Sequence, residues 1–111
     1  MSDCVFCRIV AGEIPAKLVY EDKDAIAFAD LTPRAPFHVL VVPRTHVAKL
    51  SELDDERLGG RLLQIARRVA ADAGHAGDFR MVVNNGARAG QSIAHLHLHV
   101  LGGREFGWPP G

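Results

Sequence analysis

Three histidines, His95, His97 and His99, occupy alternate positions near the end of the chain. Alternate side chains of a β-strand project to one face, so a strand over residues 95–101 would bring the three imidazoles together. Crowded imidazoles repel one another as cations, which lowers their pKa and favours neutral, nucleophilic rings near pH 7. Neutral imidazole suits attack on phosphorus, because the phosphorylated ring is itself readily attacked by water. Imidazole is also a common metal ligand, so a metal site is the rival interpretation.

The loop before these histidines, residues 84–92, is polar and punctuated by glycines. Its glycines allow close approach of a backbone, and its amide and hydroxyl groups can donate hydrogen bonds to a phosphate. Alone, such a loop is more often an ordinary surface loop. Because the first histidine follows three residues later, the combination favours phosphate chemistry.

A second group with chemical potential is the pair Cys4 and Cys7, spaced as C-x₂-C. This spacing lets two thiolates bind one metal ion, and His46 and His95 are candidates for the two further ligands. Two buried, small apolar residues are the alternative interpretation. A redox dithiol is a third, but no thioredoxin-like βαβ pattern surrounds the pair.

The hydrophobic pattern predicts a long helix in the middle of the chain. The acidic run that begins at Asp54 favours a helix N-terminus, and Gly74 is a natural terminator. One apolar stripe follows the helical period and consists of Leu58, Leu62, Ile65 and Val69. Gly59 and Gly60 weaken the first turns by about 1 kcal/mol each relative to alanine, which suggests that another chain packs closely there.

The remaining elements are short. A helix over residues 3–11 would have Asp3 as its N-cap. Strands are expected at residues 17–21, 25–29, 37–42, 80–84 and 95–101. In the last strand we expect Leu96, Leu98 and Leu101 to face the core. Short strands with few helices predict an α+β domain with a mostly antiparallel, five-stranded sheet.

Size and charge exclude several classes of protein. The 111 residues make one domain, residues 1–111, near the small end for a self-sufficient core. Thirteen basic and thirteen acidic residues balance, which excludes the basic footprint of a nucleic-acid-binding protein. No stretch is apolar over the roughly 18 to 20 residues of a membrane span, and no signal peptide is recognisable. We therefore expect a cytoplasmic protein with reduced thiols, no nucleic-acid partner and no membrane association.

These motifs together resemble the histidine triad (HIT) family and, within it, the Hint-like nucleotide-binding branch. The defining pattern His-φ-His-φ-His-φ-φ, in which φ is apolar, stands at residues 95–101. The resemblance covers nearly the whole chain. Its other matches are residues 13–17 (Glu-Ile-Pro-Ala-Lys), Asp30, Pro33, Pro36, His38, Pro43, His46, residues 90–92 (Gly-Gln-Ser), residues 102–104 (Gly-Gly-Arg) and residues 108–111 (Trp-Pro-Pro-Gly).

The resemblance implies roles for four catalytic residues. In the family the middle histidine attacks the α-phosphorus and carries a nucleotidyl intermediate, and its match is His97. His99 would hold phosphate oxygens, and His38 would orient the nucleophile and relay protons. Ser92 would lie near the scissile bond and the leaving group. For His38 a hydrogen-bonded core histidine is the alternative, because it shares a strand face with Leu40.

The resemblance also implies a nucleotide-binding site. Asp30 matches the acid that accepts hydrogen bonds from both ribose hydroxyls, which suits the two oxygens of a carboxylate. Asn84 and the backbone of Gly90, Gln91 and Ser92 would cradle the phosphate. The family positions around a purine base, adenine or guanine, are apolar and are also good core residues. They are Phe6, Ile9, Phe28, Leu31 and Leu40.

Some HIT relatives carry a cysteine pair that binds zinc together with two histidines. The matching residues here are Cys4, Cys7, His46 and His95. The resemblance therefore implies a structural zinc with four protein ligands and no open coordination position. The chemistry itself would need no cofactor.

The resemblance implies a nucleotide hydrolase, for which purine nucleoside phosphoramidates are the best substrates and dinucleoside polyphosphates or aminoacyl-adenylates the alternatives. A nucleotide-binding regulatory or adaptor module with little turnover is the competing hypothesis, and a zinc-binding structural domain is a third. We also expect a homodimer with a continuous sheet. Its tail, residues 102–111, would reach the partner's active site and dock Trp108 there.

Overall fold

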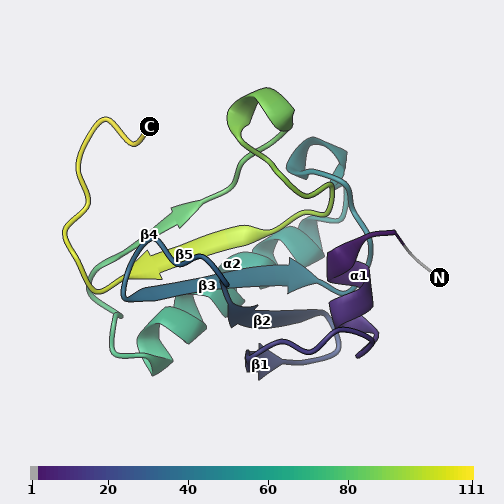
Figure 1. Cartoon of the computed structure of the whole chain (residues 1–111), viewed down its shortest axis with the longest axis horizontal. Helices are drawn as coiled ribbons and strands as arrows, with labels where there is room; N and C mark the ends of the chain where they lie inside the picture. Colours follow the sequence, from purple (N-terminus) through teal and green to yellow (C-terminus); the bar gives the residue numbers. More distant parts are fainter. Residues whose placement is uncertain (1–2) are drawn as a thin grey trace.

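An antiparallel sheet of five strands organises the computed structural model, which describes residues 3–111 (Figure 1). The strands are β1 (Leu18–Glu21), β2 (Ala25–Ala29), β3 (Phe37–Pro43), β4 (Phe79–Val82) and β5 (Leu98–Gly102). They lie in the order β1-β2-β3-β5-β4, and each neighbouring pair is antiparallel. The predicted α+β fold with an antiparallel five-stranded sheet is confirmed.

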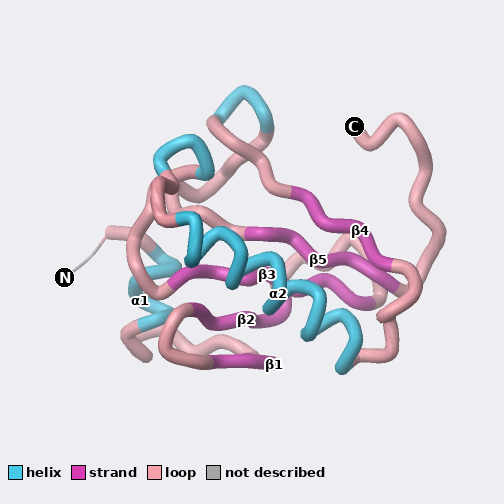
Figure 2. The backbone as a smooth tube through the Cα atoms, turned by 180° about the vertical axis from the view of Figure 1, so that it is seen from behind, coloured by secondary structure: helices cyan, strands magenta, loops and turns pink. Residues whose placement is uncertain are grey.

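The long helix α2 (Glu56–Asp72) covers one face of the sheet, as Figure 2 shows from behind. The Asp55 carboxylate caps it by accepting a hydrogen bond from the Leu58 backbone N–H. Its predicted apolar stripe is buried against alternate residues of the central strands. The members of this main core include Ala27, Val39, Val41, Leu58, Leu62, Ile65, Val69, Leu96, Leu98 and Val100.

The opposite face of the sheet carries a smaller apolar cluster under the short helix α1 (Val5–Val10). Phe6 of α1 packs there against β2 and β3, whose other alternate residues point to this side. The strand residues of the cluster are Ile26, Phe28, Leu40 and Val42. β2 and β3 are therefore buried on both faces, which explains their nearly continuous apolar sequences.

Two sequence predictions near the histidines were wrong in detail. The last strand was expected to begin at His95, but the hydrogen-bond ladder of β5 begins at Leu98. Ahead of Leu98 the backbone has other partners: the His95 carbonyl accepts a hydrogen bond from the His97 ring, and the Leu96 N–H donates to the Val47 carbonyl. Leu101 pairs with His38 and so shares the histidine face, while its neighbour takes the core position. That neighbour is Val100.

The ends of the chain also differ from expectation. Cys4, not Asp3, caps α1, since its Sγ accepts the backbone N–H of Cys7. The tail beyond β5 is an irregular segment outside the sheet (Figure 1). It leaves the sheet at Gly103, whose positive φ of 91° and close approach to Pro36 require a glycine. No helix within residues 3–111 is long and apolar enough to cross a membrane.

Candidate active site

Three imidazoles form a row on the face of the sheet opposite α2. His38 lies on β3 and His99 on β5, and the antiparallel register pairs His99 with Leu40. The ring centroids of His38 and His99 are 5.2 Å apart, and those of His99 and His97 are 5.1 Å apart. The structure thus brings together three of the four predicted catalytic side chains. His95 turns away from this row and packs edge-on against His46.

Backbone groups determine which nitrogen of His38 carries a proton. The Arg34 N–H donates to Nδ1 at 3.0 Å, so Nδ1 is an acceptor and the hydrogen of the neutral ring is on Nε2. Nε2 lies 2.9 Å from Nδ1 of His99 and 3.4 Å from the Asp30 carboxylate. His38 therefore donates to His99, whose own hydrogen must then be on Nε2. Burial lowers the pKa of His38 in spite of Asp30, which keeps the ring neutral.

The same reasoning applies to His97. Its Nδ1 lies 2.7 Å from the carbonyl oxygen of His95, and a carbonyl can only accept. Nδ1 therefore carries the hydrogen, and in the neutral ring Nε2 has a free lone pair. Phe6 packs edge-on against the ring, with centroids 5.1 Å apart, and holds its orientation.

The electrostatics of the row favour neutral rings. Burial, followed by the neighbouring His97 and His38, lowers the pKa of His99 to about 4. Burial is also the main reason why the pKa of His95 is lowered. The lowered pKa expected from crowding is therefore found at His99 in the row and at His95 beside it, but desolvation contributes more to it than repulsion between the rings.

The loop that leads into the histidines is fixed by the side chain of Gln91. Its Oε1 accepts the Gly86 N–H at 2.8 Å, and its Nε2 donates to the carbonyls of Ala48 and Ile93. The side chain of Gln91 is thus used within the loop, and its backbone N–H also donates to the Gly86 carbonyl, at 3.2 Å. Gly90 needs its positive φ of 97° and lies beside the Asn84 side chain.

The other predicted ligand-binding residues are spread around this row. Phe6, Phe28 and Leu40 are buried in the cluster under α1, and Ile9 packs against it. Leu31 is 97% exposed, so it contributes no core packing. A carboxylate oxygen of Asp30 accepts the backbone N–H and the hydroxyl of Thr32, which sets its orientation. Ser92 is exposed on the loop and lines a surface cavity.

A second cluster lies next to the histidine row and contains all four predicted metal ligands. Cys4, Cys7, His46 and His95 each offer one ligand atom, and these atoms lie within 4.8 Å of one another. His95 Nε2 donates to the Pro43 carbonyl at 2.9 Å, so its Nδ1 has a free lone pair. The His95 Nδ1 atom is 3.3 Å from Cys4 Sγ and 3.5 Å from Cys7 Sγ. The four side chains could therefore hold a metal ion.

Asp30, His38 and His99 are also close enough to hold a metal ion. Their hydrogen bonds argue against it. Nδ1 of His38 is occupied by the Arg34 N–H, so the nitrogen that faces the other two groups carries a hydrogen. His38 and His99 are instead joined by a hydrogen bond, and the Asp30 carboxylate lies 3.4 Å from His38 Nε2.

Comparison with known proteins identifies this arrangement. The family model of the HIT domain matches residues 11–106. The chain belongs to the HIT domain family. It is 51% identical to an uncharacterized HIT-like protein from Synechocystis sp., over 98% of this chain and 97% of that protein. A crystal structure of a HIT family hydrolase from Legionella pneumophila has a TM-score of 0.95 and 42% identity, covering 98% of this chain and 100% of that one. The histidine triad nucleotide-binding protein from Candida albicans has a TM-score of 0.85 and 28% identity, covering 96% and 83%.

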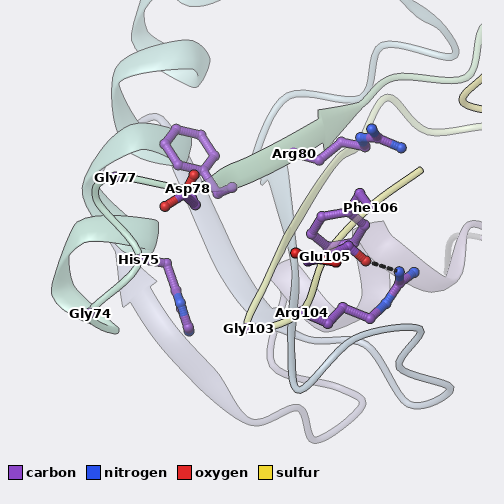
Figure 3. Close-up of a pocket in the computed structure, with 10 residues that line it drawn as sticks. Gly74, His75, Gly77, Asp78, Arg80, Gly103, Arg104, Glu105 and Phe106 are labelled. Carbon is purple, nitrogen blue, oxygen red and sulfur yellow. Dashed lines mark hydrogen bonds between the residues drawn. The ribbon is translucent and has the colours of Figure 1, made fainter. Parts of the chain in front are cut away.

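One surface cavity of this HIT domain lies away from the row of His38, His97 and His99. It has a volume of about 780 Å³ and opens between the end of α2, β4 and the tail (Figure 3). Phe106 stands there between the guanidinium groups of Arg80 and Arg104, whose carbon centres are 5.2 and 4.2 Å from its ring centroid. None of the predicted nucleotide-binding residues lines this cavity. The candidate active site is therefore chosen by the chemistry of its histidine side chains and not by the volume of a cavity.

Sequence reasoning missed the groups that orient the histidines. The Arg34 N–H, the Pro43 carbonyl and the Gln91 side chain each fix a ring or the loop. Two of them are backbone atoms, to which residue type gives no clue. Gln91 lies in the matched family motif, but its partner Ala48 is 43 residues away, and only the fold reveals it.

Proposed function

We propose that this HIT domain is a hydrolase that cleaves at the α-phosphate of purine nucleoside phosphoramidates or related nucleotides. The observation that carries the proposal is the hydrogen bond from His97 Nδ1 to the His95 carbonyl, which leaves Nε2 as a lone pair on an oriented ring. The names of two relatives support it, one a hydrolase and the other a nucleotide-binding protein.

In the first step of this proposal, the lone pair of His97 Nε2 attacks the α-phosphorus and the bond to the leaving amine breaks. The amine departs with a proton taken from solvent through the Ser92 hydroxyl, and the water of the second step returns that proton to solvent. Nε2–H of His99 donates to a phosphate oxygen, and His38 maintains that donor by occupying Nδ1 of His99. Water then attacks phosphorus, breaks the phosphorus–nitrogen bond, and releases the nucleoside monophosphate and free His97.

The nucleotide would lie along the cluster under α1. Asp30 would accept the ribose hydroxyls, because a carboxylate oriented by Thr32 still has unused acceptor positions. Asn84 and the backbone of Gly90, Gln91 and Ser92 would hold the phosphate, for which the Gly90 and Gln91 N–H groups would exchange their bonds to the Ala87 and Gly86 carbonyls for bonds to phosphate oxygens. The exposed Leu31 and the half-buried Ile9 would contact the base, while Phe6, Phe28 and Leu40 form the floor.

We further propose that Cys4, Cys7, His46 and His95 bind a structural zinc ion. A tetrahedral zinc with bonds of about 2.3 Å to sulfur and 2.0 Å to nitrogen separates its ligand atoms by roughly 3.3 to 3.8 Å. Four separations between the ligand atoms here are 3.2 to 3.5 Å. Zinc bound in this way would stabilise the contact between α1 and the histidine segment without taking part in the chemistry.

A homodimer is also part of the proposal. β4 is an edge strand of the sheet, so a second copy could extend the sheet there. On α2, Leu63 is 54% exposed, and a Cβ at Gly60 would meet nothing within 4 Å. These features favour a second copy packed along β4 and α2.

The test is a turnover screen of adenosine and guanosine phosphoramidates against dinucleoside polyphosphates and nucleotidyl sugars. We expect the phosphoramidates to be hydrolysed with the highest kcat/KM. Rapid acid-free quenching and mass spectrometry should detect a nucleotidyl group on the peptide that contains His97. Absence of turnover with every nucleotide in the screen would contradict the proposal.

A further inference from the structure

The cysteine pair and the nucleophile are linked through a single residue, His95. Its ring faces both sulfurs through Nδ1, at 3.3 and 3.5 Å. Its backbone carbonyl accepts the hydrogen bond that orients His97. Any change in what holds the ring of His95 therefore acts directly on the residue that orients the nucleophile.

A second link runs through helix α1. Phe6 lies between Cys4 and Cys7 in the sequence and packs edge-on against both His95 and His97, with centroid distances of 5.8 and 5.1 Å. Because α1 has only six residues, movement of the two cysteines must move Phe6 with them. Two independent contacts thus connect the sulfurs to His97.

The two sulfurs can reach each other and can be reached from solvent. Their ligand atoms lie within 4.8 Å, and the Cys7 backbone N–H already bonds to Cys4 Sγ at 3.3 Å. A disulfide needs sulfur atoms about 2.05 Å apart, so the two sulfurs must approach each other, and this approach pulls on the start of α1 between them. Cys4 and His46 line a surface cavity of about 560 Å³ that Ser92 also lines, so a small oxidant in the cavity meets Cys4 beside the proposed leaving-group site.

We propose that Cys4 and Cys7 form a reversible thiol switch that controls the orientation of His97. A hydroperoxide oxidises one thiolate to a sulfenic acid, and the other thiol displaces water from it to form the disulfide. In sum, two thiols and one hydrogen peroxide give one disulfide and two water molecules. The disulfide can no longer ligate a metal ion, the His95 ring loses both sulfur partners, and α1 shifts with Phe6. This proposal rests on the proposed role of His97 for its effect on activity.

The experiment treats the full chain, first reduced, with hydrogen peroxide and then with dithiothreitol. Mass mapping of the alkylated peptides should show one intramolecular disulfide between Cys4 and Cys7. Long-range ¹H–¹⁵N spectra of the histidines should show that His97 loses its fixed Nδ1–H tautomer. Turnover of an adenosine phosphoramidate should fall by about tenfold or more, since misplacement by about 1 Å can cost on the order of a hundredfold. Dithiothreitol should reduce the disulfide and restore both the His97 tautomer and the turnover.

The control is Cys4→Ser with Cys7→Ser. In this variant, peroxide should change neither the turnover nor the His97 signals from those of the same variant before treatment. If this variant does not fold, reversal by dithiothreitol in the natural chain separates a disulfide from irreversible oxidation. Failure to form the disulfide, or a disulfide that leaves the His97 spectrum unchanged, would overturn the switch. A reduced chain without turnover on any nucleotide would instead reject the proposed hydrolase, and disulfide mapping with the histidine spectra would still test the switch.

Discussion

At the scale of single residues, backbone atoms determine the chemistry that each histidine offers. His97 donates to a carbonyl and exposes Nε2, whereas His38 accepts from the Arg34 N–H and exposes a donor. Two rings of the same residue type, with centroids 5.2 and 5.1 Å from that of His99, are therefore suited to opposite tasks. In the proposed mechanism, His97 is the nucleophile and His38 holds a donor in place on His99.

We predict that His97→Ala abolishes turnover and preserves binding. Loss of a covalent nucleophile should lower kcat by on the order of 10³-fold or more, because the two-step route no longer exists. Nucleoside monophosphate affinity should stay within about tenfold, since Asp30 and the apolar cluster are intact. Single-turnover kinetics and calorimetric titration measure the two quantities. His75→Ala is the matched control, as its ring contacts Phe37 outside the site, and it should keep turnover. Comparable activity in His97→Ala would end the nucleophile assignment.

The sequence predicted the residue types of the site better than their environment. Alternation along residues 95–101 correctly indicated that His97 and His99 lie together. It also placed His95 in that row, whereas its ring faces Cys4 and His46. The reason is that the chain leaves the ladder before Leu98, so side chains ahead of that residue do not follow the strand period.

At the scale of elements, a polar network joins the β1–β2 turn to α2. Asp22 accepts hydrogen bonds from the Tyr20 hydroxyl, from Arg61, and from the backbone N–H groups of Asp24 and Ala25. Burial works to raise the pKa of Asp22, but these hydrogen bonds outweigh it and hold the pKa well below its usual range. The carboxylate therefore stabilises the folded state only while it is ionised.

Asp22→Asn should accordingly lower the free energy of unfolding by about 1–3 kcal/mol at pH 7, because Arg61 and Tyr20 lose an ionised acceptor. A folded-state pKa below the unfolded value of about 3.9 gives stabilisation that is complete above that pH and declines as the pH falls further. The difference between the two proteins should thus shrink below about pH 4. Urea denaturation at pH 7 and pH 3 measures it, with exposed Asp72→Asn as the control. An equal difference at both pH values would contradict this account.

Helix α1 illustrates what periodicity can and cannot predict. The long stripe of α2 extends over several turns and was predicted correctly from spacing alone. α1 has six residues, too few to be stable by helix propensity, so contacts with β2, β3 and the cysteine cluster must determine where it begins. This is why its cap is Cys4.

We therefore predict one tightly held zinc per chain that supports α1. Cys4→Ser with Cys7→Ser should lose the metal and lower the Tm, because a structural metal contributes directly to folding free energy. Elemental analysis of protein purified without added zinc, together with thermal denaturation, measures both effects. The single variant His46→Ala removes one ligand and leaves both thiols in place, and it should show an intermediate loss. A metal content near zero in the natural chain would refute the four-ligand site.

At the scale of the whole molecule, the chain leaves apolar surface uncovered on its tail. Trp108 is 83% exposed although a tryptophan offers a large apolar area. The base of the tail is nevertheless anchored, because Arg80 donates to the Gly107 carbonyl and Phe106 is held between two arginines. An anchored segment that presents an exposed indole favours a partner that covers it.

Deletion of residues 105–111 should therefore change the choice of leaving group and little else. If the tail reaches the second copy's active site, its loss removes contacts with the amine but none with the base, ribose or α-phosphate. We expect the ratio of kcat/KM for bulky against small amine leaving groups to change by about tenfold, the effect of roughly 1.4 kcal/mol of binding energy. Nucleoside monophosphate affinity and the dimer in sedimentation should remain, because β4 and α2 are untouched. The milder variant Trp108→Ala keeps the path of the tail, and a similar change there would assign the effect to the indole. A monomeric natural chain, or an unchanged leaving-group profile after the deletion, would show that the tail serves only its own protomer.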